Sequence, residues 1–420
     1  MKADLIIFNI TTVYTPYSVP PIRGKNMSRL YSLDHAFIAV QGDRILAIST
    51  GSYDQHIAEY TVLHDAKGAI AIPGLIDSHT HLVHAGSREV EYDKMKLGVP
   101  YLDILKAGGG ILNTVEKTRL ASFGELYRKA YQSLDEMMLY GITAIEAKSG
   151  YGLNLETEVK QLSVARELSK DHPIHIISTY MGAHAIPKEY THYKDDYIDE
   201  VVEDLKFIKK NGLAEAVDVF CEEGAFNVED TKHILMSAHA MGFKVKLHAD
   251  EIQSIGGTAL GIELGASSID HLMNITDQDI IKLSKTDVTA NLLPGTSFYL
   301  KKSFAPARKM IDAGCIVSIS GDYNPGSCPT ENFQFIMQLA YQNYQMKPEE
   351  ILNATTLNAA YHLGIHDTCG SLEPGKLANI VLLNVPNLSY MLYHFGINHT
   401  KDVFIEGKLV VSNREIVRKV

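Results

Sequence analysis

The chain has 420 residues, of which 45% are hydrophobic and 21% are charged, the composition of an ordinary globular protein. Its formal net charge is −11 and it has no cluster of basic residues, so we expect no binding to nucleic acid or to an anionic membrane. The four cysteines form no C-x-x-C pair and no apolar run approaches the roughly eighteen residues of a membrane span, which together favour a reducing cytoplasm.

The two ends of the chain have the pattern of short alternating strands. Residues 1–70 contain DLIIFN and AFIAVQGDRILAIS, and the tail from about residue 370 contains ANIVLLN and DVFIEGKLVV. Turn-forming residues separate these segments at the spacing of a small sandwich. The sequence therefore predicts a composite β-sandwich domain from residues 1–70 and 370–420, and a second domain from residues 71–369.

In the middle of the chain, short apolar runs alternate with longer helical patterns such as FGELYRKAYQSLDEMMLY and LETEVKQLSVARELSK. The short runs are GLIDSHTH, TAIEAKSGYG, IHIISTYMGAHA, AVDVFCEEGAF, KVKLHADE, SSIDHLMN, VTANLLPG and IVSISGDYN. Eight strands alternating with helices predict an α/β fold, a TIM-like (β/α)8 barrel. A doubly wound open sheet is the alternative, because a one-dimensional pattern does not show whether a sheet closes.

The first of these runs ends in an H-x-H pair, His79 and His81. Residues i and i+2 of a strand point to the same face, so both imidazoles would be directed at one point, as ligands of a shared metal ion are. Two separately partnered histidines at a strand end are the alternative, because the motif is short.

Other runs also end in polar residues, and in such barrels the chemistry lies at the carboxyl ends of the strands. His184 follows the third run, His248 the fifth, Asp270 and His271 the sixth, and Asp322 the eighth. Three imidazoles and a carboxylate suit zinc or a similar first-row ion that keeps an open position for water.

The expected nitrogen ligands are His79, His81 and His248. Asp322 is expected both to reach the metal and to accept the proton of the attacking water, while His271 hydrogen-bonds the substrate oxygen or the nucleophile. His233 and His239 lie in the helical stretch KHILMSAHAMG and are expected to be packing or surface residues.

Several longer motifs resemble those of the amidohydrolase superfamily, whose members have a metal-dependent barrel flanked by a composite β-sandwich. These motifs are GLIDSHTHLVHAGSR, KAGGGILNTVEKTR, EAKSGYGL, MGAHAIP, KLHADEI and SGDYNPGS, and the resemblance extends essentially from end to end. Within the superfamily, the chain resembles the enzymes that open an imidazolone ring in histidine breakdown. The H-x-H pair marks only the superfamily, whereas KAGGGI with T-x-x-x-x-R and KSGYGL is much narrower.

The resemblance carries over residue by residue. It places the ligands of a single zinc or iron ion, divalent or trivalent, at His79, His81, His248 and Asp322. It places the substrate contacts at Arg88, Tyr151, His184, Glu251, Asn324, Gly326 and Ser327. Cys221 and Glu222 stand where dinuclear relatives carry a bridging lysine, which favours one metal over two.

The implied reaction is hydrolysis of the cyclic amide of 4-imidazolone-5-propanoate to N-formimidoyl-L-glutamate, with a metal-bound hydroxide as nucleophile. Asp322 is the expected proton acceptor, Glu251 is expected to orient the ring N–H or the water, and His184 and His271 to polarise the carbonyl. The sequence does not divide the acid and base roles among Glu251, His271 and Asp322, because such groups titrate as a coupled set.

Arg88 has two interpretations. It is either a surface ion pair, which would contribute little to stability, or a two-pronged clamp on the substrate propanoate, which a planar guanidinium suits. The resemblance favours the clamp. The run Gly108-Gly109-Gly110 lacks the Lys-Ser/Thr that follows in a P-loop, so nucleotide binding is not expected.

Two other functions stay open. One is deamination of a cyclic amidine such as guanine or cytosine, whose neutral rings need no carboxylate clamp at Arg88. The other is a barrel without metal that serves as an interaction scaffold, although all four expected ligand positions are filled. The expected partners are a small-molecule substrate and, from the resemblance, a second copy of the chain in a homodimer.

Overall fold

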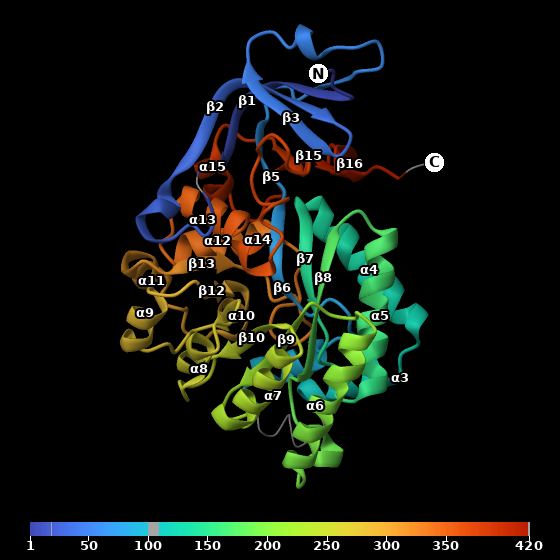
Figure 1. Cartoon of the computed structure of the whole chain (residues 1–420), viewed down its shortest axis with the longest axis vertical. Coiled ribbons are helices and arrows are strands. Elements are labelled where there is room, and N and C mark those ends of the chain that lie inside the picture. The colour runs from blue at the N-terminus through green and yellow to red at the C-terminus, as the bar shows by residue number, and fades with distance from the viewer. Residues whose placement is uncertain (18, 100–108, 419–420) are drawn as a thin grey trace.

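The structure is a computed structural model that describes residues 1–17, 19–99 and 109–418. The first three residues of the KAGGGI motif, 106–108, therefore lie outside the described residues. The strands form two sheets, an eight-stranded sheet in the middle of the chain and a nine-stranded sheet from its two ends (Figure 1). None of the described helices is long and apolar enough to cross a membrane.

The eight-stranded sheet consists of the eight predicted strands, each parallel to the next in chain order. They are β6 (Leu75–Thr80), β7 (Ile142–Lys148), β8 (His175–Ala183), β9 (Ala216–Cys221), β10 (Lys244–Ala249), β11 (Ser268–His271), β12 (Thr289–Leu292) and β13 (Ile316–Ile319). Most of their residues are buried on both faces, as expected for a parallel sheet that helices cover.

The barrel closes where the first strand meets the segment after the last. The Asp322 amide donates to the His79 carbonyl at 2.9 Å, and the His81 amide donates to the Tyr323 carbonyl at 2.8 Å. Thr80 and Tyr323 form a parallel bridge between these two contacts. The (β/α)8 barrel is thereby confirmed, and the open doubly wound sheet is wrong.

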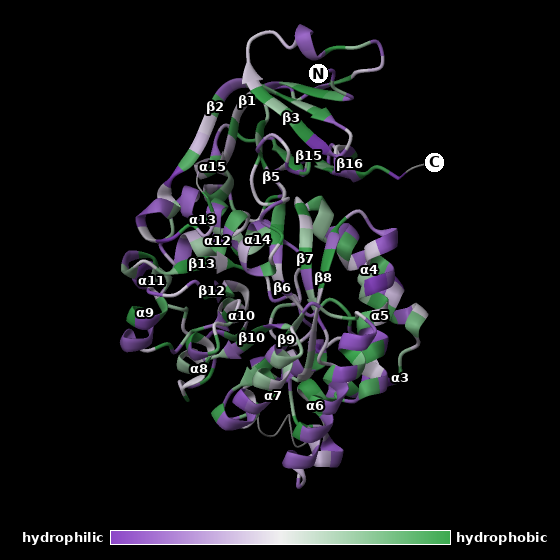
Figure 2. Cartoon of the chain, in the orientation of Figure 1, coloured by the Kyte–Doolittle hydropathy of each residue, from purple (hydrophilic) through white to green (hydrophobic). Residues whose placement is uncertain are grey.

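Helices follow the strands and surround the barrel (Figure 1). They are α1 (Glu89–Lys96), α3 (Ile111–Leu120), α4 (Phe123–Leu139), α5 (Leu155–Asp171), α6 (Lys194–Lys210), α7 (Val228–Ala240), α8 (Gly257–Glu263), α9 (Asp277–Leu283), α10 (Pro294–Leu300), α11 (Ala307–Ala313), α12 (Phe333–Asn343), α13 (Pro348–Ala354) and α14 (Leu357–Leu363). The predicted helices at 123–140 and 155–170 are α4 and α5, and each begins at a polar cap, Ser122 or Asn154. Both carry hydrophilic and hydrophobic residues, as amphipathic helices do (Figure 2).

The nine-stranded sheet joins the two ends of the chain. Its strands are β1 (Leu5–Pro16), β2 (Leu30–Gln41), β3 (Arg44–Thr50), β4 (Val62–Asp65), β5 (Ile70–Pro73), β14 (Ile380–Leu383), β15 (Thr400–Ile405), β16 (Lys408–Ser412) and β17 (Glu415–Ile416), and the short helix α15 (Leu388–Tyr393) follows β14. Antiparallel pairing of β5 with β14 makes the junction, for example at Ile72 and Val381. Residues from both ends, including Ile38 and Phe404, share one buried apolar cluster, so the sheet is composite as predicted.

Candidate metal centre and substrate pocket

Three histidines meet at the carboxyl end of the barrel. His79 is the fifth residue of β6, His81 follows that strand, and His248 lies on β10. Each offers a ring nitrogen, and these three atoms lie within 4.8 Å of one another. The side chains are almost fully buried, so the strand-end pattern has brought together the three imidazoles that it indicated.

Two carboxylates from the barrel interior orient two of these rings. Asp270 Oδ2 lies 2.5 Å from His79 Nδ1, and Asp218 Oδ1 lies 3.0 Å from His248 Nδ1. The Nε2 atoms of both rings are buried and have no hydrogen-bond partner among residues 1–17, 19–99 and 109–418. A buried polar atom without a partner is costly, and a metal ion would satisfy both atoms at once.

Asp322 completes the set. Its Oδ1 atom lies 3.5 Å from His79 Nε2 and 3.9 Å from His81 Nε2. Burial raises the pKa of Asp322, but the neighbouring His79 outweighs burial and holds the pKa below its usual range. Three imidazole nitrogens and one carboxylate oxygen are a donor set that zinc accepts, so these residues fit a single metal ion.

The protonation of His248 agrees with this set, whereas His79 must lose a proton to become a ligand. Burial lowers the pKa of His248 to about 4, so this ring is neutral at pH 7 and free to ligate. Burial and Lys148 also lower the pKa of His79, but Asp270 and Asp322 outweigh them and raise it to about 9. A cation at His79 Nε2 must therefore displace a proton, which couples metal binding to pH.

A buried charge network lies beneath the histidines, and sequence reasoning missed it. The Lys148 ammonium lies 2.6 Å from Asp218, 3.0 Å from Glu146 and 3.5 Å from Asp270, and Lys246 lies 2.7 Å from Glu146. Burial lowers the pKa of Lys148, but the three carboxylates outweigh it and raise the pKa above its usual value. The network thereby keeps Asp218 and Asp270 ionised and directed at the two imidazoles.

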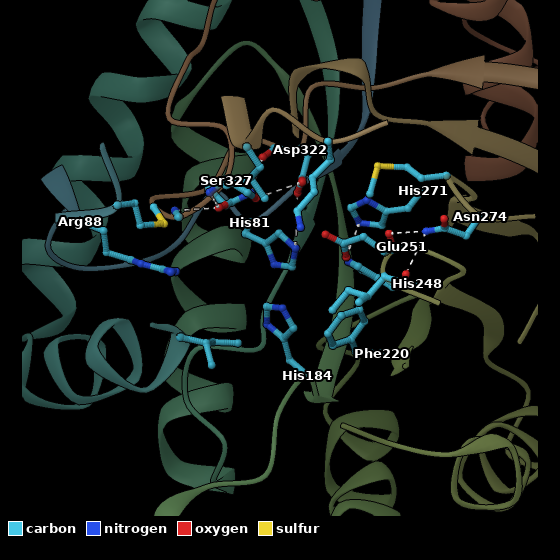
Figure 3. Close-up of a pocket in the computed structure, with 18 of the residues that line it drawn as sticks. His81, Arg88, His184, Phe220, His248, Glu251, His271, Asn274, Asp322 and Ser327 are labelled. Carbon is cyan, nitrogen blue, oxygen red and sulfur yellow. Dashed lines mark hydrogen bonds and ion pairs between the residues drawn. The ribbon is translucent and has the colours of Figure 1, made fainter. Parts of the chain in front are cut away.

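A pocket of about 750 Å³ opens beside the histidines. All the expected substrate contacts line it, namely Arg88, Tyr151, His184, Glu251, Asn324, Gly326 and Ser327. His271 and three of the expected metal ligands line it as well (Figure 3). Several lining residues were not expected from the sequence, among them Phe220, Met273, Asn274 and Lys302.

His184 faces His81 across the pocket. Their rings stack with centroids 4.8 Å apart (Figure 3). Tyr151 packs against both rings. Burial lowers the pKa of His184 to about 3, and His184 Nδ1 lies 2.9 Å from the Gly150 carbonyl oxygen. A neutral ring in this position carries its proton on Nδ1, so Nε2 offers a lone pair to the pocket. His184 is therefore suited to accept a hydrogen bond from a ligand rather than to polarise a carbonyl.

Glu251 and His271 face each other on the opposite wall of the pocket (Figure 3). His271 Nε2 lies 3.6 Å from Glu251 Oε2. Desolvation raises the pKa of the Glu251 carboxyl group. His271 has a φ of +78°, a left-handed conformation that is rare for residues other than glycine and that clusters at functional sites.

Arg88 precedes helix α1 and its guanidinium lies inside the pocket wall. Arg88 Nε donates to Glu91 at 3.1 Å, and Glu91 also accepts from the Gly110 amide. The other end of the guanidinium lies against Gly326, where a Cβ atom would come within 2.2 Å of Arg88 Nη1. With 14% of its side chain exposed, Arg88 is not the surface ion pair of the alternative interpretation.

Asn324 braces the loop that contains Gly326 and Ser327. Its Oδ1 accepts from both of their amides at 2.8 Å, and its Nδ2 donates to the Asp322 carbonyl and to Ser327 Oγ. Since both ends of this amide are occupied within the loop, Asn324 shapes the pocket more than it offers free polar groups to a ligand.

Comparison with known proteins agrees with this geometry. The sequence model of the Amidohydrolase family matches residues 70–410. An imidazolonepropionase from Fusobacterium nucleatum is 47% identical over 98% of this chain and 99% of its own. Another from Alkaliphilus metalliredigens is 47% identical over 99% of this chain and 100% of its own. The chain belongs to the imidazolonepropionase family.

Solved structures of other enzymes share the fold. An adenosine deaminase from Xanthomonas campestris with bound zinc superposes with a TM-score of 0.74 over 100% of this chain and 95% of its own, at 20% identity. An N-isopropylammelide isopropylaminohydrolase from Burkholderia multivorans gives a TM-score of 0.71 over 99% of this chain and 100% of its own, at 18% identity. At such identities the likeness shows the fold alone. Membership of the imidazolonepropionase family therefore rests on the sequence comparison. It agrees with the family that the sequence motifs predicted.

Proposed function

We propose that this protein hydrolyses the cyclic amide of 4-imidazolone-5-propanoate to N-formimidoyl-L-glutamate, a step of histidine degradation. The observation that carries the proposal is that one pocket contains both His81 and His248, from the imidazole triad, and the Arg88 guanidinium. The triad suits activation of water at a carbonyl, and the guanidinium suits a substrate carboxylate. The identity of 47% to imidazolonepropionases over nearly the whole chain supports the same reaction.

A single zinc or iron ion would be held by His79, His81, His248 and Asp322. When bound, it would supply a Lewis acid that lowers the pKa of a coordinated water to about 7 and polarises the amide carbonyl. Asp322 would accept the proton of the attacking water, and that proton must later reach the leaving ring nitrogen. Asp322, Glu251 and His271 line the same pocket, and the proton would pass among them.

The remaining residues would bind and orient the ring. The His184 Nε2 lone pair would accept from a ring N–H, and Tyr151 would pack beside it. Glu251, whose raised pKa brings its titration closer to neutral pH, would hold or deliver a proton on the opposite side. Arg88 would bind the propanoate, a charge that does not change while the ring opens.

The direct experiment is an assay with freshly generated imidazolone propanoate, followed by loss of its ultraviolet band, with guanine and cytosine as controls. We expect turnover of the imidazolone alone. Release of ammonia from guanine or cytosine at a comparable rate would instead favour the deaminase. If the metal-loaded protein turns over none of the three compounds, the proposed substrate class is wrong.

Replacing Arg88 with Ala should raise KM for the imidazolone propanoate more than it lowers kcat, because the carboxylate is bound equally in the ground and transition states. Losing this charge-assisted contact should cost about 2 kcal/mol, roughly thirty-fold in kcat/KM. Arg88→Lys should restore only part of the loss, since an ammonium lacks the two-pronged geometry. The measurement is steady-state kinetics of both variants.

The control for Arg88 is an imidazolone without the side-chain carboxylate. Both variants should turn over this truncated compound at nearly the wild-type rate. If the two substrates suffer equally, or neither does, the carboxylate assignment is wrong.

Replacing Gly326 with Ala should act through Arg88, because the new Cβ would lie 2.2 Å from Arg88 Nη1 and must displace the guanidinium. We expect KM for the same substrate to rise by about ten-fold with little change in kcat. A matched control is Gly124→Ala in α4, where a Cβ would lie 3.3 Å from Arg128 Nη1 far from the pocket. An unchanged KM in Gly326→Ala would contradict the placement of Arg88.

The proposal extends to the setting of the enzyme. All four cysteines are free and buried, which supports a reducing cytoplasm. The resemblance supports a homodimer that acts on a small-molecule substrate. The two sheets support a division of the chain into a domain from its two ends and a central barrel, with the boundary after β5 (Ile70–Pro73) instead of at residue 70, because β5 lies in the nine-stranded sheet.

A further inference from the structure

The segment after β10 carries Glu251 but has no strand partner of its own. Residues 250–253 leave the barrel in an irregular conformation, and Asp250 has a φ of +53°. Backbone N–H and C=O groups in such a turn need partners from elsewhere. Those partners decide where the Glu251 carboxylate lies.

Glu222, in the loop after β9, accepts the amides of this segment. Its Oε2 accepts from the Glu251 amide at 3.0 Å and the Ile252 amide at 2.9 Å, while its Oε1 accepts from the Gln253 amide at 3.0 Å. The Glu222 residue is 1% exposed, and within the described part of the chain no Lys, Arg or His forms an ion pair with it. Backbone amides alone therefore balance a buried carboxylate.

Asn274, in the loop after β11, binds the carbonyls of the same segment. Its Nδ2 donates to the Glu251 carbonyl at 2.9 Å and to the Ile252 carbonyl at 3.1 Å, and it lies 3.4 Å from the Asp250 carbonyl oxygen (Figure 3). The Asn274 amide donates to the Asp250 carbonyl at 2.8 Å. Glu222 thus takes the donors of the segment and Asn274 takes its acceptors.

We infer that Glu222 and Asn274 are positioning residues for the reaction, which hold the Glu251 carboxylate at its place beside His271. The two residues lie in the loops after β9 and β11, the strands on either side of β10. They therefore fix the segment from two directions. The inference rests on the proposed function for its catalytic consequence, and on the contacts alone for its structural part. The sequence suggested no role of its own for Glu222, whose position served only to favour one metal over two.

A single substitution of Glu222 or Asn274 removes a defined set of hydrogen bonds to the segment. Both Glu222 oxygens face N–H groups, so Glu222→Gln must turn an NH₂ group toward at least one of them and lose that bond. Asn274→Ala removes the Nδ2 donor to the Glu251 and Ile252 carbonyls. It keeps the backbone bond to the Asp250 carbonyl and leaves the amides of the segment bound to Glu222. Glu223, the exposed neighbour of Glu222, provides a matched control as Glu223→Gln.

The experiment is a kinetic double-mutant cycle on the metal-loaded enzyme. Glu222→Gln and Asn274→Ala should each lower kcat at least about ten-fold, because small misplacements of a reacting group are costly. In a Glu251→Gln background the same changes should lower kcat less than about two-fold further, since they act through Glu251. Equal losses in both backgrounds, or no loss in the wild-type background, would overturn the inference.

Hydrogen exchange separates this result from a failure of the proposed function. In Glu222→Gln the amides of residues 251–253 should exchange at least about ten-fold faster, while Glu223→Gln leaves them unchanged. If the wild-type protein does not turn over the imidazolone, the proposed function is wrong. Accelerated exchange confined to residues 251–253 would still support the role of Glu222 in holding this segment. Unchanged exchange in Glu222→Gln would overturn the inference, whatever the activity of the enzyme.

Discussion

Replacing Asp322 with Asn lowers kcat at least about 100-fold while most of the metal stays bound, if Asp322 is the proton acceptor that we propose. Asn keeps an oxygen at the position that lies 3.5 Å from His79 Nε2, so it can still meet the cation. It cannot take the proton of the attacking water. The measurement combines steady-state kinetics with metal analysis of the same preparation.

Two results would contradict the assignment of Asp322 as the proton acceptor. Near-normal turnover in Asp322→Asn would assign proton acceptance to Glu251 or His271. A parallel loss of metal and activity would mean that the Asp322 charge serves mainly to bind the ion, because its loss would then act on occupancy rather than on proton transfer. Reloading the variant with excess metal separates these two effects.

Replacing His248 with Ala should remove most of the metal and with it nearly all activity. The wild-type protein should hold close to one equivalent of zinc or iron, as a single set of four ligands implies. Loss of a carboxylate that orients a ligating imidazole typically costs roughly 10–100-fold in metal affinity, so loss of the imidazole itself should cost more. Elemental analysis after dialysis measures both quantities.

His233 provides the control for His248, because it lies on α7 away from the pocket. His233→Ala should retain the full equivalent of metal. A wild-type stoichiometry near two would mean that His184 or His271 binds a second ion, and the single-metal assignment would then be wrong.

The barrel and the three histidines were predictable because their signals are local. Each strand is a short apolar run, and a polar residue at its carboxyl end shows in the sequence whatever the rest of the fold does. His79 and His81 are also two residues apart, so strand periodicity alone directs them to one side. Closure of the barrel was not predictable in this way, since it depends on bonds between residues at opposite ends of the barrel sequence.

The residues that support the site were harder to predict, because their partners lie on other strands. Glu146 and Lys148 are two residues apart on β7, as Lys246 and His248 are on β10, and this alternation signals a polar barrel interior. The pairing of Lys148 with Asp218 depends on the order and register of the strands.

Glu222 shows the same limit of sequence reasoning. The resemblance marked it only as a position, with Cys221, where dinuclear relatives carry a bridging lysine, and gave no sign that its oxygens bind backbone amides of the next loop. Backbone amides leave no mark in a sequence, because every residue except proline has one.

The backbone bonds that close the barrel, between β6 and the segment after β13, indicate when the site can assemble during folding. The amide of Asp322 bonds to the carbonyl of His79, so a proposed ligand from the first strand and a proposed ligand from beyond the last become neighbours only when the barrel closes. Contacts between such distant parts of a chain carry a large entropic cost and tend to form late. The growing chain thus carries three of the four proposed ligands before it can assemble the proposed site, and a barrel that ends before Asp322 would lack the fourth.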